Sequence, residues 1–276
     1  MVFPGQAKFY RKTVKIDESR FPMKSLIKNF REELKIYRDI LIKNIANFDL
    51  YKQAIQNKSG IEIGGPSKIF HKEIPVYRFI KKLDGVNFSN NTIWQGSISE
   101  GENYNFYKKK PPGYQYISEA TDLSKISDGH YEFLISSNCL EHSANPLKAI
   151  LEWRRVLKEK GILILVVPKK DLNFDHKRRD TEFNALLKAY ENDFNESDLS
   201  TLDEIIENHD IELDPGVQSL EEFKTRSLEN YQNRCLHHHV YSSELIKEVF
   251  KYTNFRLIDI GSTDQDFYAL AEKNSS

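Results

Sequence analysis

The chain has 276 residues, with 40 Lys and Arg against 41 Asp and Glu and a formal net charge of -1. This balance gives no electric field that would draw the protein onto a polyanion. The stretch from Ala189 to Phe223 holds twelve acidic residues and no Lys or Arg. Because such a surface repels phosphate backbones, we exclude nucleic acid as a partner.

The cysteine content and the hydropathy of the chain indicate the cellular compartment to expect. Cys139 and Cys235 are the only cysteines and lie far apart in the sequence, so they form neither a disulfide framework nor a cysteine metal site. The N-terminus lacks the apolar core of a signal peptide, and no apolar run approaches the ~20 residues that span a bilayer. We therefore expect a soluble, cytoplasmic protein with no membrane span.

Apolar residues near the N-terminus repeat at helical spacing, at Leu26, Phe30, Leu34, Tyr37 and Leu41. This stripe predicts a helix over roughly residues 24–57, and we take residues 1–58 as an N-terminal helical extension. Two partners suit its apolar face. It packs either on the main domain or on a second copy of the chain, which would make a homodimer through these helices.

Strands and helices alternate between Ser59 and Pro168. Short apolar strands are predicted at residues 61–63, near Val86, and at 114–118, 131–136 and 161–168. Asn145 and Pro146 suit the N-cap and first position of a helix, and Gly161 suits its C-cap. Strands alternating with helices favour a doubly wound α/β fold with a mostly parallel sheet.

The alternation of strands and helices ends after Pro168. Two helical stripes follow, one of Phe183, Leu186, Leu187 and Tyr190, the other of Leu202, Ile205, Ile206 and His209. Thr201 and Glu204 have the spacing of a capping box for the second helix. We therefore predict a helical cap inserted over residues 169–241, which would contact the substrate. The α/β domain comprises residues 59–168 and 242–276.

The turn after the first strand is the first place to look for a ligand, because open α/β sheets bind ligands at the carboxyl ends of their strands. Here Glu62 stands beside Gly64, Gly65 and Pro66. The spacing is not the G-x-G-x-x-G of dinucleotide-binding folds. A plain tight turn explains this motif equally well when it is taken alone.

Five runs occur in order with suitable spacing: Glu119–Leu123, Tyr131–Ser137, Leu140–His142, Asn145–Leu147 and Arg155–Gly161. Together they resemble the class I S-adenosylmethionine-dependent methyltransferases, in a small-molecule and glycan branch similar to methyltransferase type 11. The resemblance covers residues 59–168 well and 242–271 loosely. It implies a Rossmann-like, mostly parallel, seven-stranded sheet, S-adenosyl-L-methionine as cofactor, and methyl transfer as the reaction.

The resemblance also implies a set of cofactor contacts. Glu62, Gly64 and Gly65 would line the methionine part, and Asp84 would end the second strand and bind the ribose hydroxyls. Pro66 departs from the family pattern, in which a glycine is usual. Asp84 also suits a simple turn with the glycine that follows it.

Two further groups follow the third and fourth strands. The resemblance implies that Glu119 and Ala120 face the adenine. It also implies that the second group borders the sulfonium, namely Ser136, Ser137 and Asn138. A solvated loop acid is the alternative interpretation of Glu119.

Methyl transfer to a hydroxyl needs a base, and histidine suits that role near neutral pH. His142 follows the fourth strand, near the expected position of the methyl group, although it also suits a bond that orients the turn. His176 lies just beyond the fifth strand. We predict that one of the two is the catalytic base.

Three consecutive histidines, His237, His238 and His239, end the predicted insertion. On an extended segment the first and third would share a face, and Asp175 or His176 would complete a metal site. Because nothing in the sequence fixes that geometry, we assign no metal. We expect the three histidines to form a polar wall of the acceptor site.

Arginines near the insertion suit a phosphate or carboxylate on the acceptor: Arg178, Arg179 and Arg234. Ion pairs with the acidic helices are the alternative. Residues 87–94 and 233–240 look like a subgroup associated with glycan assembly. We predict an O-methyltransferase for a small polar acceptor, such as a sugar, a nucleotide sugar or a polysaccharide intermediate. The alternatives are a catalytically silent cofactor-binding scaffold and an NAD-dependent oxidoreductase.

Overall fold

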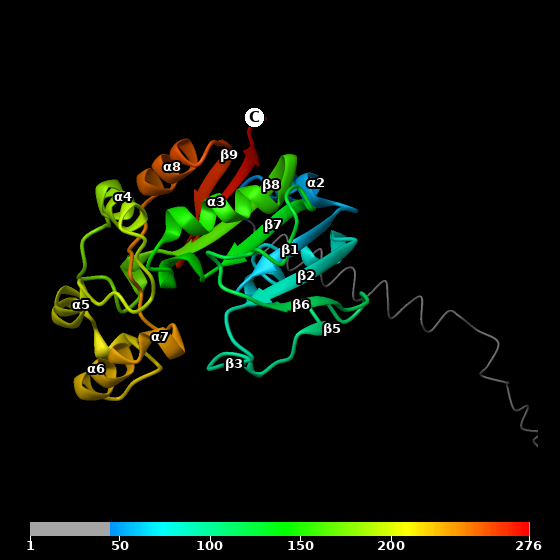
Figure 1. The fold of residues 1–276 in the computed structure, drawn as a ribbon. Helices are drawn as coiled ribbons and strands as arrows, with labels where there is room; N and C mark the ends of the chain where they lie inside the picture. Colours follow the sequence, from blue (N-terminus) through cyan, green and yellow to red (C-terminus); the bar gives the residue numbers. More distant parts are fainter. Residues whose placement is uncertain (1–44, 276) are drawn as a thin grey trace, which may run out of the picture. The chain divides into compact units, whose positions relative to one another are not determined.

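The computed structural model describes residues 45–275. Their main feature is an eight-stranded sheet with the order β5-β6-β2-β1-β7-β8-β10-β9 (Figure 1). Its strands are β1 (Ser59–Ile63), β2 (Lys82–Asn87), β5 (Gly101–Tyr104), β6 (Gly113–Ile117), β7 (Tyr131–Ser137), β8 (Leu157–Pro168), β9 (Phe255–Ser262) and β10 (Asp266–Lys273). A separate short hairpin joins β3 (Asn91–Thr92) to β4 (Gly96–Ser97).

The sheet confirms the predicted mostly parallel α/β class. Strands β6, β2, β1, β7 and β8 pair in parallel, whereas β10 is antiparallel to both of its neighbours. The sheet has one strand more than the seven expected, because β5 adds an antiparallel edge to β6. No strand was predicted over residues 101–104, where Tyr104 is the one buried residue.

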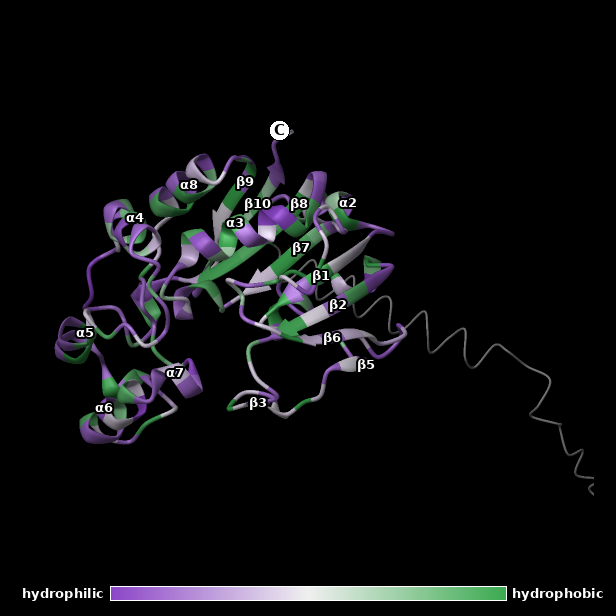
Figure 2. Ribbon diagram, viewed as in Figure 1, coloured by the Kyte–Doolittle hydropathy of each residue, from purple (hydrophilic) through white to green (hydrophobic). Residues whose placement is uncertain are grey.

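Successive side chains along the central strands alternate between two apolar clusters. One cluster packs against helices α3 (Pro146–Val156) and α8 (Ser243–Tyr252) and includes Leu134 and Leu163. The other includes Phe133 and Ile164 and packs against α2 (Phe48–Ile55) and the 3-10 helices η2 (Lys68–Phe70) and η3 (Tyr77–Phe79). Figure 2 shows the hydrophobic colouring of the central strands between these layers.

Helix α3 begins as predicted and ends differently. The Asn145 side chain accepts a hydrogen bond from the Lys148 backbone N–H at 3.2 Å, and Pro146 occupies the first turn. The predicted C-cap at Gly161 is wrong. The helix ends at Val156, and β8 starts at the next residue, so Gly161 lies inside a strand.

The region between β8 and α8, which we call the insertion (residues 169–241), carries the two predicted helices, α4 (Phe183–Glu191) and α5 (Leu202–Asn208). It also contains helices that were not predicted: α6 (Leu220–Leu228), the short α7 (Asn230–Asn233) and the 3-10 helices η5 (Lys170–Leu172) and η6 (Ile211–Leu213). Leu186 of α4 joins the core of the sheet, whereas α5 and α6 share a small cluster of their own. Thr201 precedes α5, but its side chain makes no capping hydrogen bond, so the predicted capping box is wrong.

The N-terminal extension is described only from residue 45 onward. There α2 packs on the sheet, and the Tyr51 hydroxyl donates to Asp259 at 2.9 Å. The predicted stripe from Leu26 to Leu41 lies outside the described residues, so the homodimer stays a prediction. Among residues 45–275, no helix is long and apolar enough to cross a membrane.

Candidate functional site

The carboxyl ends of the parallel strands gather most of the predicted cofactor residues at one edge of the sheet. Gly64 follows β1, Ser137 ends β7, and Glu119 comes two residues after β6. Strand β1 pairs with both β2 and β7, so the turns after β1, β2 and β7 are neighbours. This edge is where open α/β folds bind ligands.

Glu62 lies beneath the first turn, with its carboxylate fully buried. It accepts hydrogen bonds from the hydroxyls of Tyr77 and Tyr104, each at 2.6 Å for the shortest contact, and from the Ser67 backbone N–H at 3.0 Å. Burial raises the pKa of Glu62 to about 7, although these hydrogen bonds oppose the rise. The carboxylate therefore holds the turn from inside, through neutral donors.

The two glycines of this turn are required by close packing. Gly64 has φ +79°, and a Cβ added there would lie 2.9 Å from the Cβ of Cys139. A Cβ at Gly65 would lie 2.1 Å from the carboxyl carbon of Glu62. No side chain fits at either position, so the backbone of this turn closes directly on the turn after β7.

The structure corrects the predicted position of Asp84. This residue lies in the middle of β2, which continues to Asn87. Its carboxylate accepts from the Tyr114 backbone N–H at 2.8 Å and from the Tyr131 hydroxyl at 2.8 Å. Those partners stand at the starts of β6 and β7, away from the carboxyl edge. Asn87 ends the strand instead and donates to the Gly65 carbonyl at 3.0 Å.

The predicted adenine side meets the insertion. Arg234 donates to the Glu119 carboxylate at 2.6 Å, and its guanidinium lies 4.9 Å from the ring centre of Phe88, which follows β2. Burial raises the pKa of Glu119, although Arg234 opposes the rise. The neighbouring Ala120 carbonyl accepts from the Trp153 indole at 2.9 Å. The insertion thus contacts the sheet at this position.

The three residues predicted to border the sulfonium differ in exposure. Ser136 is fully buried and donates to the Ile63 carbonyl at 3.2 Å, so it links β7 to β1. Ser137 is buried at the strand end, and Asn138 is exposed with φ 48°. Burial raises the pKa of Asp266, at the start of β10, to about 6, and the nearby Asn138 opposes the rise.

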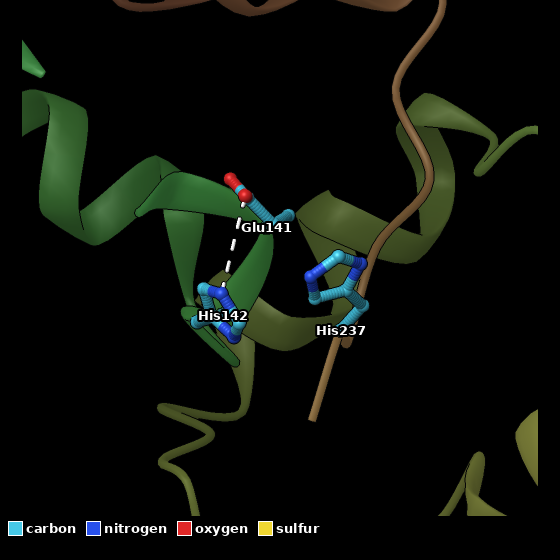
Figure 3. Close-up of side chains that lie close together, drawn as sticks. All are labelled: Glu141, His142 and His237. Carbon is cyan, nitrogen blue, oxygen red and sulfur yellow. Dashed lines mark ion pairs between the residues drawn. The ribbon is translucent and has the colours of Figure 1, made fainter. Parts of the chain in front are cut away.

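The 3-10 turn η4 (Leu140–His142) follows β7 and meets the end of the insertion. Glu141, His142 and His237 come together there, and their nearest ligand atoms lie within 4.8 Å of one another (Figure 3). We call these three residues the edge cluster. The backbone N–H of His238 donates to the Glu141 carbonyl at 2.8 Å, which fixes the last segment of the insertion against the turn.

Glu141 is buried and the two histidines are partly buried, and this changes the electrostatics of the edge cluster. Burial raises the pKa of Glu141 to about 7 and lowers that of His142 well below its usual value. Burial also acts to lower the pKa of His237, but hydrogen bonding and attraction to Asp175 prevail and raise it. A carboxyl and an imidazole with displaced pKa values at a ligand edge are typical of a functional site.

The three consecutive histidines point to three different partners. His237 joins the edge cluster, His238 bonds through Nε2 to the Asn230 amide at 3.0 Å, and the Nε2 of His239 lies 3.4 Å from the Ala144 carbonyl. Burial lowers the pKa of His238 to about 3 and that of His239 to about 4. The second and third histidines are thus buried and engaged in packing the insertion onto the sheet.

The remaining predicted residues contact the insertion itself. The ring of His176 bonds to Asp210 at 2.8 Å. Arg178 is buried and donates to Asp175 at 3.0 Å and to the His237 carbonyl at 2.8 Å. Arg179 is exposed. Of the two predicted bases, His142 lies in the edge cluster, whereas His176 is bound to the insertion.

No role was predicted for Glu141, although it lies in the run Leu140–His142. None was predicted for Asn87 at the end of β2 or for Asp266 at the start of β10. The only available signal was position, because each stands at the carboxyl edge. Nothing in local periodicity distinguishes such residues from ordinary loop polar groups.

Comparison with known proteins identifies the family. A model of the methyltransferase domain matches residues 31–260, and the chain belongs to this family of S-adenosylmethionine-dependent methyltransferases. A search of curated proteins gave no match.

Solved structures of low sequence identity are also similar. A SAM-dependent methyltransferase from Methanosarcina mazei is 13% identical, with 82% of this chain and 98% of that chain covered and a TM-score of 0.47. One from Aquifex aeolicus is 13% identical, with coverages of 81% and 87% and a TM-score of 0.42.

S-adenosyl-L-methionine is the methyl donor of this family, and the residues at the edge suit it. The Glu119 carboxylate is an acceptor for an amino group, and Ser137 and Asn138 offer polar atoms at the end of β7. The two glycines let the first turn pack directly against Cys139 and Glu62. The family assignment leaves the NAD-dependent alternative without support, since the dinucleotide spacing is also missing.

Proposed function

We propose that this methyltransferase acts on a hydroxyl of a small polar acceptor, a sugar, nucleotide sugar or glycan intermediate, held between the edge cluster and the insertion. The observation that supports this is the edge cluster itself, with one carboxylate and two imidazoles within 4.8 Å of one another beside the end of β7. A hydroxyl must lose its proton to become an effective nucleophile, whereas a neutral amine need not lose one before it attacks. Groups that manage a proton are therefore most useful to a hydroxyl acceptor.

We propose that Ser137, Asn138 and Glu119 hold the cofactor, while Glu62 keeps the first turn in place from below. The bound cofactor supplies a sulfonium methyl group: the acceptor oxygen bonds to the methyl carbon, the carbon–sulfur bond breaks with its electron pair left on sulfur, and the hydroxyl proton departs. The chain's own contribution is to hold the two reactants in line and to receive that proton at the edge cluster.

The acceptor side of the proposal uses the polar end of the insertion. Tyr231 is 56% exposed and stacks on Arg234, and Trp94 on the hairpin is 45% exposed and lies 6.0 Å from the ring of His142. Aromatic faces beside hydrogen-bonding groups suit the apolar faces and hydroxyls of a sugar ring. Arg178 and Arg234 already pair with carboxylates, so an anionic acceptor would have to compete with these contacts.

The test is methyl transfer from tritiated S-adenosylmethionine by the full chain. The acceptors are free sugars and nucleotide sugars, the same sugars with every hydroxyl methylated, and small amines of similar size. We expect label on the first group alone. Transfer to amines alone would contradict the hydroxyl assignment, and tight cofactor binding without transfer to any acceptor would support the silent scaffold instead.

The same assay decides between the two predicted bases. General-base catalysis contributes about 100-fold or more. We therefore expect His142→Ala to lower kcat at least 100-fold, and His176→Ala to lower it less than tenfold because that ring is bound to Asp210. The reverse ranking would move the base to His176.

A further inference from the structure

The three side chains of the edge cluster are brought together from distant parts of the chain and held there by backbone contacts. Glu141 and His142 belong to the turn after β7, and His237 comes from the end of the insertion. The Glu141 carbonyl accepts from the backbone N–H groups of His238 at 2.8 Å and His239 at 3.4 Å. The cluster is thus fixed at its base by two segments of main chain.

Each imidazole of the cluster has one ring nitrogen fixed by an acceptor. The Nδ1 of His237 lies 2.6 Å from a carboxylate oxygen of Asp175, and the Nδ1 of His142 lies 3.3 Å from the Leu236 carbonyl. An acceptor at Nδ1 places the proton there and leaves the lone pair on Nε2. Metal-binding histidines show this pattern, with a carboxylate or carbonyl behind the ring that orients it and raises its basicity.

One carboxylate oxygen of Glu141 has no hydrogen-bond partner. The residue is 1% exposed, and its Oε2 has no hydrogen-bond partner. Its Oε1 lies 4.0 Å from the Nε2 of His142, beyond hydrogen-bond distance (Figure 3). A buried, unpartnered carboxylate oxygen is costly unless a cation or donor satisfies it.

The charges nearby do not supply that cation. Arg178 is a buried cation, and it already donates to Asp175 and to the His237 and His238 carbonyls. Its charge is therefore balanced by Asp175, which in turn orients His237. Among the described residues, no Lys or Arg pairs with the carboxylate of Glu141.

We propose that Glu141, His142 and His237 bind a divalent first-row transition metal ion, and that Zn²⁺ is the ion their ligand set fits. Two imidazole nitrogens and one carboxylate oxygen form a known set for catalytic zinc, with a fourth position left open. Zinc–nitrogen bonds of about 2.1 Å place ligand atoms about 3.4 Å apart, so a small rotation of the side chains closes the site. Mg²⁺ and Ca²⁺ prefer oxygen ligands and do not suit it.

The inference extends the proposed function and rests on it only for the role of the open position. That position would hold the acceptor hydroxyl, because a bound Zn²⁺ lowers the pKa of a coordinated hydroxyl group. With the metal bound, the Nε2 of His142 is a ligand and no longer a base, so the hydroxyl proton passes to water in place of the edge cluster. The oxygen then takes the methyl group as described above. This revises the expectation from sequence, in which no metal was assigned and a different set of residues was considered.

The test begins with binding, which needs no acceptor. The full chain is stripped with a chelator, and Zn²⁺ binding is measured by calorimetry, with Co²⁺ as a spectroscopic probe of ligand geometry. We expect one Zn²⁺ per chain, and at least tenfold weaker binding in His142→Ala, His237→Ala and Glu141→Gln. His130→Ala is the matched control, because His130 is exposed and lies outside the cluster. Retained cofactor binding by each variant verifies its fold.

Several results would overturn the metal site. They are the absence of stoichiometric Zn²⁺ binding, equal binding by the cluster variants and the control, or displacement of Zn²⁺ by on the order of millimolar Mg²⁺. Full methyl transfer by the stripped enzyme would remove the metal's role while the proposed function stands. Tight Zn²⁺ binding without transfer to any hydroxyl would support the site and count against the proposed function.

Discussion

The sheet and the insertion are stabilised by different means. The sheet is enclosed by two apolar clusters, and large side chains such as Trp153 and Phe133 are fully buried there. The small apolar cluster of the insertion has five buried members: Leu202, Ile205, Val217, Phe223 and Leu236. Ion pairs supplement it, including the buried pair of Arg178 with Asp175 and the partly buried pair of Arg226 with Asp214. The insertion therefore depends much more on charge.

Two buried carboxylates express this difference. Glu62 under the sheet edge is held by tyrosine hydroxyls and one backbone N–H, so no cation compensates its charge. Asp214 in the insertion accepts from His209 at 3.0 Å and from Arg226 at 2.6 Å. Burial without a cation raises a carboxyl pKa, whereas cationic partners lower it. The two regions should therefore respond to pH in opposite directions.

The largest expected effect is Trp153→Ala, which removes a fully buried indole between α3 and the sheet and the hydrogen bond to Ala120. Large-to-small changes of this kind cost about 3–5 kcal/mol of unfolding free energy. Chemical denaturation followed by circular dichroism measures the loss. The change should unfold the sheet and the insertion together, because α4 packs on the same core.

Trp94→Ala is the matched control, because Trp94 is 45% exposed and the chain has two tryptophans. We expect it to change the unfolding free energy by less than about 1 kcal/mol. Each variant also leaves a single tryptophan as a fluorescence probe. Equal losses in the two variants would show that the apolar layers do not dominate the stability of the sheet.

The regular elements were the predictable part of the fold. The strands predicted at 131–136 and 161–168 and the helix from Pro146 follow clearly from apolar periodicity and capping, because burial on a sheet or helix face imposes that periodicity. The end of α3 was not predictable, because β8 begins directly at Leu157 and Gly161 is a strand residue. Tertiary pairing of β8 with β7 and β10 overrides the local signal of a glycine.

The site was predictable only in location. The turns after β1, β6 and β7 do meet at one edge, as strand order requires. Side-chain direction was not predictable, because it depends on partners distant in the sequence. Thus Asp84 is held by Tyr131, and of three adjacent histidines only His237 reaches the edge cluster. The cofactor roles of Glu119 and Ser137 remain predictions.

A smaller effect tests the carboxylate of the sheet. Burial raises the pKa of Glu62 from 4.5 to about 7, so the folded protein binds a proton there that the unfolded chain releases. Stability from this group is therefore highest below pH 4.5 and falls as the pH rises to about 7. At about 1.4 kcal/mol per pKa unit, the change is at most about 3.5 kcal/mol.

Glu62→Gln should remove this part of the pH dependence. The difference in unfolding free energy between wild type and variant is measured by urea denaturation from pH 5 to pH 8, and it should shift in favour of the variant as pH rises. Glu102→Gln, at an exposed position, should leave the pH dependence unchanged. A constant difference across this range would mean that the Glu62 carboxyl is already ionised at pH 5.

The smallest effect tests the carboxylate of the insertion. Burial raises the pKa of Asp214, but bonds to His209, Arg226 and the Gly216 N–H outweigh it and hold the pKa below its usual range. Its contribution to stability is therefore present above about pH 3.8 and is lost as the pH falls below that value. Hydrogen bonds to charged groups contribute about 2 kcal/mol each, so Asp214→Asn should destabilise α5 and α6 by about that amount at pH 7.

Hydrogen exchange at pH 7 locates this loss. Amides of α5 and α6 should exchange about 30-fold faster in Asp214→Asn, while those of β7 and β8 stay unchanged, since 1.4 kcal/mol is about tenfold in an equilibrium constant. Glu207→Gln, an exposed change on α5, should have little effect. In acid, pepsin digestion below pH 3.8 should attack wild type and variant alike, because the wild-type carboxylate is losing its charge there. Faster exchange in the central strands as well would mean that the insertion and the sheet unfold as one unit, and that the charged contacts of the insertion support the whole molecule.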